Sequence, residues 1–508
     1  MIRAEPAVYG AFGMAAAYYT YPLLISAPKG FYIILGLLFL LAAITAFSRV
    51  LKSLSIIHIK NAGKFTVLAA AVAAGFSLGI ASRRTVPSGA ELGFKADRIT
   101  ALSGTLREDP RTLNGGSGIG RLALLSSAAS GGMRSSAGGS ITVFFPSESI
   151  PRLKEFGRGS QIYVEGSILA GNSLSERAEP VFRASSVHIV KPAPAIEQFR
   201  TGLRMKLIDR FQNRRSARGG KPAGGPVWGG LASALLLGVR DDLDADLSEG
   251  FRNSGCTHIL ALSGMHLAIL SGVLAFFLRR VLGIRWASLA GAVFIVFYIF
   301  IAGSQPSLVR AGIMYLLGTF ALWGLLNTKP FPLLCMAFII QLIFQSESGT
   351  SLSFILSYLA LGGILTLGES IRSLLKGRLP EIISGGLSAS LGAFIITAPV
   401  VVFCFGSLRP IGIAAGLILA PLASLFMLFS LAALAASFLP TPLWEILDLA
   451  LTGIYRFLEF LVSLAGRVPG ISFANPYPVL VFTLVFWLLL LFTLRRDRLY
   501  RDTIASFD

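Results

Sequence analysis

Long apolar runs separated by short polar turns occupy most of this chain. Three runs open the sequence, at about 7–25, 31–47 and 65–82. Most runs approach the ~20 residues that a helix needs to cross the hydrocarbon core of a bilayer. Further runs follow in the second half, at 258–279, 286–302, 308–326, 332–345, 351–368, 384–405, 411–437 and 477–494. The pattern predicts a polytopic α-helical membrane protein.

The segment 443–465 is amphipathic, and it affects the number of crossings. Basic loops favour the cytoplasmic side of a membrane. The C-terminal tail carries Arg495, Arg496 and Arg498, so it should lie in the cytoplasm. Counting 443–465 as a further crossing brings the tail back to that side. We therefore expect about 11–12 transmembrane helices.

Residues 90–190 follow a different pattern, because long apolar runs stop and short alternating stretches appear. Such stretches are expected at 99–106, 141–145, 161–169 and 181–190, separated by glycine- and serine-rich loops. Alternation with a period of two between turns is typical of antiparallel strands. About 100 residues suit a small OB-like barrel. Since the basic loop between the second and third runs should be cytoplasmic, we expect this all-β domain to be extracytoplasmic.

A basic connector spans 191–226, with nine basic and two acidic side chains. Part of it, 196–211, has helical spacing of its apolar residues. One interpretation is an amphipathic helix on the lipid surface. The other is an electrostatic binding strip for a polyanion such as DNA. The arginines proposed for that role are Arg200, Arg204, Arg210, Arg214 and Arg215.

Composition agrees with a membrane protein. Of the 508 residues, 54% are hydrophobic and only 14% are charged, against about 25% in soluble domains. This excludes a soluble enzyme and a disordered chain. The net charge of +19 favours an anionic membrane face, an anionic ligand, or both. The three cysteines form no CxxC pair, and we expect no metal or cofactor.

These patterns divide the chain into five regions. The expected boundaries are 1–84 for N-terminal transmembrane helices, 85–190 for the OB-like domain, 191–226 for the basic amphipathic connector, 227–437 for the transmembrane core, and 438–508 for C-terminal amphipathic and transmembrane helices with a basic tail.

The most distinctive segment is an acidic loop that leads into an apolar stretch with two of the four histidines. Taken as one helix, that stretch places His258 and His266 eight residues apart, or roughly 80° apart around the axis. Ser263 and Gly264 lie between them and allow close helix approach or a local break. Two interpretations stay open. The histidines are hydrogen-bonded within a tight helix contact, or they line a polar passage, because ionisable groups at membrane depth usually face a cavity or the bundle interior.

A second polar segment is 302–311. Pro306 suits the first turn of a helix, and Ser304 or Gln305 can cap that helix. Arg310 then lies one turn into the membrane. It either extends to the interface or faces a passage, where a guanidinium binds phosphate in a two-pronged geometry.

These segments resemble the ComEC-type competence proteins, the inner-membrane DNA-uptake channels of naturally transformable bacteria. The resemblance rests on four ordered blocks between about 228 and 430. They are Leu236-Leu237-Gly238 with Phe251, Gly255, His258 and Ser263-Gly264-Met265-His266; Ala302 to Ala311; Ser351 to Ala360; and Thr397-Ala398-Pro399 with Ala420-Pro421. The third block lacks the Gly-Phe-Gln that often opens it.

The resemblance implies a multi-pass protein of the bacterial inner membrane that imports single-stranded DNA during natural transformation. It also implies a DNA receptor and a cytoplasmic ATP-driven helicase as partners, beside the membrane lipids, and is compatible with a homo-oligomer. The residues expected to line the DNA path are His258, Ser263, Gly264, His266, Gln305, Ser307, Arg310, Ser353 and Ser357.

Long members of the family end in a metallo-β-lactamase-like domain, which needs an H-x-H-x-D-H cluster. No two of the four histidines here are two residues apart, so we expect no nuclease domain and a channel rather than an enzyme. One alternative is a transporter of small molecules or lipid precursors. Another is an intramembrane hydrolase in which Ser263 is the nucleophile and His258 or His266 the base.

Overall fold

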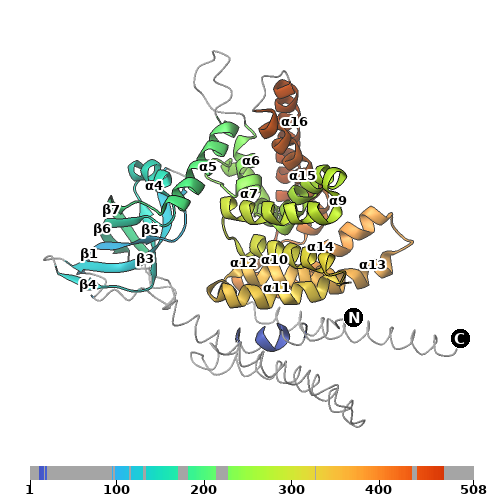
Figure 1. Cartoon of the computed structure of the whole chain (residues 1–508), viewed down its shortest axis with the longest axis horizontal. Coiled ribbons are helices and arrows are strands. Elements are labelled where there is room, and N and C mark those ends of the chain that lie inside the picture. Colours follow the sequence, from blue (N-terminus) through green and yellow to red (C-terminus); the bar gives the residue numbers. More distant parts are fainter. Residues whose placement is uncertain are drawn as a thin grey trace, which may run out of the picture. The chain divides into compact units, whose positions relative to one another are not determined.

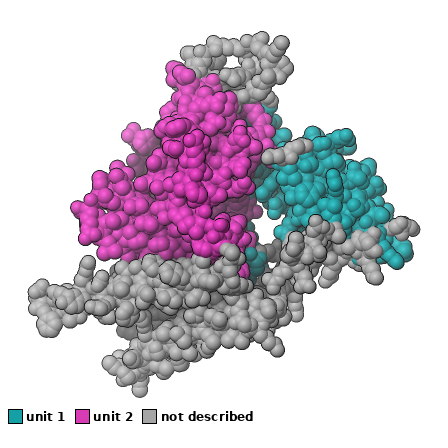
Figure 2. All heavy atoms as spheres, turned by 180° about the vertical axis from the view of Figure 1, so that it is seen from behind, with its two compact units in different colours: residues 1–209, 292–303, 313–350 teal, residues 210–291, 304–312, 351–508 magenta. Residues whose placement is uncertain are grey.

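The computed structural model describes a large part of the chain in two compact units. The described residues are 8, 11–15, 18–19, 94, 98–113, 116–129, 133–169, 181–212, 227–326, 328–437 and 443–473. The predicted spans at 31–47, 65–82 and 477–494, together with Arg214 and Arg215, lie outside them. One unit comprises 1–209, 292–303 and 313–350, and the other 210–291, 304–312 and 351–508 (Figure 2).

A β-domain lies in the first unit (Figure 1). Its strands are β1 (Ile99–Leu106), β2 (Arg111–Thr112), β3 (Gly118–Ala129), β4 (Arg134–Ser136), β5 (Ser140–Phe145), β6 (Gln161–Leu169) and β7 (Val181–Lys191). The order β1-β6-β7-β5-β3 closes on itself, because β3 also pairs with β1. Only the β5–β7 pairing is parallel, and helix α4 (Ile150–Phe156) comes between β5 and β6. The strands therefore form a closed ring, and the assignment of this ring to the OB-like barrels, which are five-stranded Greek-key folds, stays a prediction.

The barrel is filled by the inward-facing residues of these strands. Leu102, Val143, Ile162 and Phe182 are completely buried in one apolar cluster. Each has outward-facing neighbours, as the period of two in a strand requires. Phe145 is also in this cluster, so it cannot serve as an exposed surface for stacking bases.

The second half is helical. The elements are α5 (Ala195–Gln212), α6 (Gly229–Leu237), α7 (Ala245–Asn253), α8 (Thr257–Leu260), α9 (Gly264–Ala302), α10 (Pro306–Trp323), α11 (Pro330–Phe344), α12 (Leu352–Gly363), the π-helical turn η6 (Ile364–Gly368), α13 (Glu369–Leu375), α14 (Glu381–Phe405), α15 (Ile411–Ala436) and α16 (Leu443–Gly466).

Six helices in the described part are long and apolar enough to cross a membrane. They are α9, α10, the continuous run of α12, η6 and α13, and α14, α15 and α16. The amphipathic segment expected at 443–465 is among them. The span expected at 258–279 begins later, at Gly264, and shares α9 with the span expected at 286–302. Helix α9 is broken at Gly283, where φ is +74°. The span expected at 332–345 is the shorter α11, with 15 residues.

The helices after residue 350 pack closely through small residues. A Cβ built on Gly363 of α12 would lie 2.3 Å from the carbonyl oxygen of Gly392 in α14, so the two backbones are in contact. Small residues give membrane helices this close approach. Pro399 and Pro421 lie inside α14 and α15, as expected from the sequence. The fold is that of a polytopic α-helical membrane protein with a β-domain.

Candidate functional site

The histidine-bearing stretch is interrupted, so of the two possibilities left open at Ser263 and Gly264 the structure shows the local break. Helix α8 ends at Leu260, Ala261 is extended (φ −79°, ψ 138°), and α9 begins at Gly264. The 80° separation of His258 and His266 therefore does not apply. His258 is exposed on α8, whereas His266 is fully buried in the first turn of α9.

His266 closes the start of α9. The backbone N–H of Ser263 donates to Nδ1 of His266 at 3.1 Å. Ser263 precedes the first helical residue and His266 is the third, so the pair matches one half of a capping box, in which the third side chain bonds the N–H of the cap residue. The Ser-Gly-Met-His sequence therefore marks the start of a helix rather than its middle.

The start of α10 lies against this break. The hydroxyl of Ser307 donates to the carbonyl of Leu262 at 2.6 Å. A Cβ built on Gly238 would lie 2.7 Å from Cδ1 of Leu262 and 3.1 Å from Nε2 of Gln305. Gly238 ends α6 with a φ of +69°, which glycine adopts without strain. The Leu-Leu-Gly block, the Ser-Gly-Met-His block and the start of α10 thus meet in one place.

Arg310 points into this same region. It is 8% exposed, and its Nη1 donates to the backbone carbonyl of Ser357 in α12. Its guanidinium carbon lies 5.8 Å from the ring centre of Tyr358. A Cβ built on Gly264 would be 3.4 Å from Nη2 of Arg310, so the side chain lies along the start of α9. Arg310 is thus buried beside α9 and α12 and does not extend to the interface, while its place on a passage stays a prediction.

Three buried polar atoms of this site have no hydrogen-bond partner among the described residues. They are Nε2 of His266, Nε of Arg310 and Oγ of Ser357. Because Nδ1 of His266 accepts a hydrogen bond, the neutral ring carries its proton on Nε2. The site therefore presents two unused N–H donors and a hydroxyl. Buried donors nearly always have partners, and an oxyanion is the group that would satisfy these best.

Two predicted residues stand apart from this group. His258 and Ser353 are both exposed, and in the described part of the chain no hydrogen bond joins either of them to Arg310 or His266. Ser263, Gly264, His266, Gln305, Ser307, Arg310 and Ser357 are brought together by the contacts above. The two exposed side chains remain candidates for the path only at its edge.

The same geometry argues against the hydrolase alternative for Ser263 and His266. A general base needs a free acceptor nitrogen facing the nucleophile. Nδ1 already accepts from the Ser263 backbone, and Nε2 carries the proton. The contact between the two residues thus runs through the backbone of Ser263.

Two of the connector arginines proposed to attract DNA, Arg200 and Arg204, are engaged in ion pairs. Nη2 of Arg200 donates to both carboxylate oxygens of Asp109, at 2.7 and 2.8 Å, and its Nε donates to Glu197 at 2.7 Å. Arg204 also pairs with Asp109, and Arg158 with Glu197. The carboxylates neutralise these positive charges and hold α5 on the β-domain. We therefore remove Arg200 and Arg204 from the set of arginines proposed to attract DNA. Arg210 instead donates to the carbonyl of Ser437 at 3.2 Å.

Acidification should weaken this ion cluster. Burial alone would raise the pKa of Asp109, but the hydrogen bonds and charges of Arg200 and Arg204 offset it and lower the pKa. For Glu197 burial is likewise offset by Arg158 and Arg200, and its pKa is lowered. A lowered pKa stabilises the folded state above the ordinary value near 4, and this stabilisation is lost as pH falls through the folded pKa.

We therefore expect the difference in thermal unfolding midpoint between the wild type and Asp109→Asn to be constant from pH 7 to 5 and to shrink below pH 4. The measurement is a melting curve of the purified protein in detergent at each pH. A difference that already shrinks between pH 7 and 5 would contradict this assignment.

Comparison with known proteins identifies the helical half. The sequence pattern of the family described as competence protein matches residues 235–498, just over half of the chain. ComE operon protein 3 of Bacillus subtilis (strain 168) is 28% identical over 277 residues, which are 52% of this chain and 34% of that protein. An uncharacterized protein of Aquifex aeolicus (strain VF5) is 28% identical over 243 residues, which are 47% of this chain and 55% of that protein. The matches span about a third and about half of these relatives.

The apolar helices and the β-domain define the class, a multi-pass membrane protein of the bacterial inner membrane. The chain belongs to the competence protein family, which confirms the resemblance found in its sequence blocks.

Proposed function

We propose that this protein forms a path for single-stranded DNA across the inner membrane during natural transformation. Membership of the competence family supports a role in DNA uptake, and the similarity to ComE operon protein 3 covers the same half of the chain. The path would run past the breaks between α8 and α9 and between α9 and α10.

The observation that carries the proposal is the buried charge of Arg310. No carboxylate among the described residues pairs with it, although burying a charge in a membrane bundle is costly. Beside it lie the unused donor of His266 and the unused hydroxyl of Ser357. A phosphate oxygen passing this point would accept from these groups and would balance the charge. These contacts would offset part of the free-energy cost of moving the DNA strand out of water.

The driving force would come from partners. The sequence has no Walker A pattern, so a cytoplasmic ATP-driven helicase would pull the strand, and a DNA receptor would deliver it. A homo-oligomer is compatible with this scheme.

The test is to delete the gene from its host and follow fluorescent DNA in single cells. We expect DNA to accumulate at the cell surface, while entry of the label into the cytoplasm and the number of transformants fall to background. Expression of the intact chain from a second locus should restore both. Normal entry of the label in the deletion strain would refute the proposal.

A further inference from the structure

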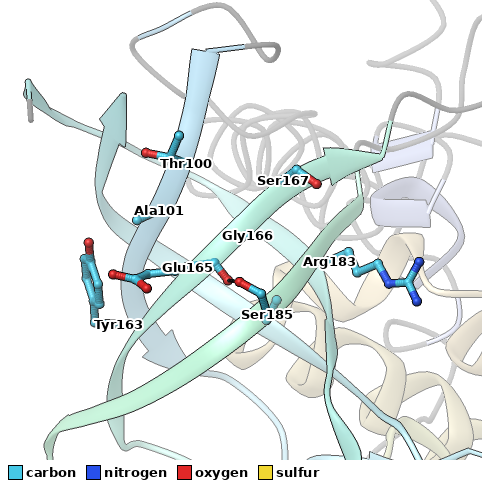
Figure 3. A pocket seen from close by; sticks show the side chains of 9 residues that line it. Thr100, Ala101, Tyr163, Glu165, Gly166, Ser167, Arg183 and Ser185 are labelled. Carbon is cyan, nitrogen blue, oxygen red and sulfur yellow. Dashed lines mark hydrogen bonds between the residues drawn. The ribbon is translucent and has the colours of Figure 1, made fainter. Parts of the chain in front are cut away.

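The β-domain carries a feature that the membrane core does not explain, namely two hollows separated by one tyrosine. The larger, of about 560 Å³, is lined by residues of β1, β6 and β7, among them Thr100, Glu165, Arg183 and Ser185. The smaller, of about 450 Å³, is lined by residues of β1, β3, β4, β6 and β7. Tyr163 and Ala101 line both. Figure 3 shows Tyr163 beside Glu165 at one end of the larger hollow and Arg183 at the other.

Strand register explains why Tyr163 stands out from its surroundings. Its neighbours Ile162 and Val164 face the barrel core, so the Tyr163 ring faces outward. Directly opposite on β1 is Ser103, and opposite Ser103 on β3 is Ser126. The next row holds Ala101 and Ala128. On its other side Tyr163 lies opposite His188 of β7, which also lines the smaller hollow. The ring is therefore open toward β1, where the small side chains leave room for a planar ring.

Charge on this surface favours an anionic partner. Arg183 lies in the larger hollow and Arg134 in the smaller; both are exposed, and neither pairs with a carboxylate among the described residues. Glu165 is the one carboxylate that lines either hollow, and its Oε2 accepts a hydrogen bond from Ser186. The remaining polar lining is mostly hydroxyl groups, which donate to phosphate as well.

We propose that this surface, defined by Tyr163, Arg134 and Arg183, binds single-stranded DNA, with a base stacked on Tyr163 and the flanking phosphates on the two arginines. Proteins that bind single strands combine stacking on aromatic rings with cations that follow the backbone. The inference rests on the proposed function for its choice of partner. It places the strand over the outward faces of β1 and β6 and the adjoining part of β3 and β4, and not over β5. OB domains commonly bind on the pair of strands that corresponds here to β3 and β5.

The test measures binding of a fluorescent dT oligonucleotide to the full chain in lipid nanodiscs. Tyr163→Ala should weaken binding about 5- to 100-fold, the loss expected for one stacked base, while Tyr163→Phe should bind as the wild type does. Ser126→Leu, which fills the smaller hollow and leaves the ring in place, should also weaken binding. The Ser126→Leu variant therefore tests the proposal even if Tyr163→Ala does not fold.

The roles of Arg134 and Arg183 are tested through the salt dependence of DNA binding. Arg134→Gln and Arg183→Gln should each lower the slope of log affinity against log salt by about 0.7, the value for one phosphate contact in a single strand. Arg152→Gln is the matched control, because Arg152 is exposed on α4 and lines neither hollow. Its slope should not change. Equal effects of all three substitutions would overturn the site.

The inference and the proposed function fail separately. If Phe144→Ala on β5 weakens binding and Tyr163→Ala does not, the strand binds the other face and the inference is overturned, while import through the core stands. If the deletion strain imports DNA normally, the proposed function fails whatever the oligonucleotide affinities are. We expect Tyr163→Ala cells to import less DNA when DNA is limiting and nearly normal amounts when it is saturating.

Discussion

Replacing Arg310 with alanine is expected to reduce entry of labelled DNA into the cytoplasm by about 10- to 100-fold, the effect of losing one hydrogen bond to a charged group. The guanidinium is buried and lies along the start of α9, where in the proposed path it would meet a phosphate. Without it, the strand would pass this point with an unbalanced charge. The measurement is the fluorescence of imported DNA at equal amounts of membrane protein.

The unfolding temperature of Arg310→Ala distinguishes a role of Arg310 in transport from a structural role. Because the charge of Arg310 faces no described carboxylate, its removal relieves a desolvation cost. Arg310→Ala should therefore unfold at a temperature equal to or above that of the wild type. A protein that melts much earlier than the wild type would show that Arg310 acts mainly as a support for α12.

Arg310→Lys is the informative conservative change. Lysine keeps the charge but lacks the fork that allows Arg310 to bond the Ser357 carbonyl and a phosphate together. We expect it to restore only a small part of import. Arg378→Ala is the matched control, because Arg378 is exposed between α13 and α14. Full activity of Arg310→Ala would refute the path proposed here.

In the β-domain the sequence predicted the strands that alternate strongly and missed the two short strands β2 and β4 and the longest strand, β3. Four predicted strands match β1, β5, β6 and β7 to within a residue at either end. The central strand β3 was missed because Gly118–Ala129 is mostly glycine, alanine, leucine and serine, which have no strong strand preference. Its conformation is set by pairing with β1 on one side and β5 on the other, and such contacts are not visible in a local pattern.

The candidate site was partly visible in the sequence. Pro306 and Arg310 were placed correctly, because proline at the start of a helix is a local signal. At Ser263 and Gly264 the sequence left close helix approach or a local break open, since apolar residues continue through this point, and the structure shows the break. Histidine at the third helical position resembles the glutamate of a capping box, and this signal could have revealed the break. Asp109 was also missed, because nothing local connects it to Arg200, 91 residues later.

The long-range contact between Asp109 and Arg200 leads to the second prediction with a large effect. Replacing Asp109 with alanine should destabilise the junction of the β-domain and α5 by about 1.5–3 kcal/mol, the contribution of hydrogen bonds to charged groups, because Arg200 keeps its pair with Glu197. The side chain of Arg200 is only 2% exposed and would lose its two bonds to Asp109. The measurement is amide hydrogen exchange of residues 195–209 in the full chain, which should increase strongly while exchange in α14 stays unchanged.

A double substitution distinguishes an unpaired buried charge from a loss of packing. Arg200→Met removes the charge and retains much of the side-chain volume, so Asp109→Ala with Arg200→Met should exchange more slowly than Asp109→Ala alone. The pair between Glu197 and Arg158 would then still hold part of the contact. If the double variant exchanges as fast as the single one, the stability of the junction comes from packing around Asp109, and the ion cluster contributes little to it.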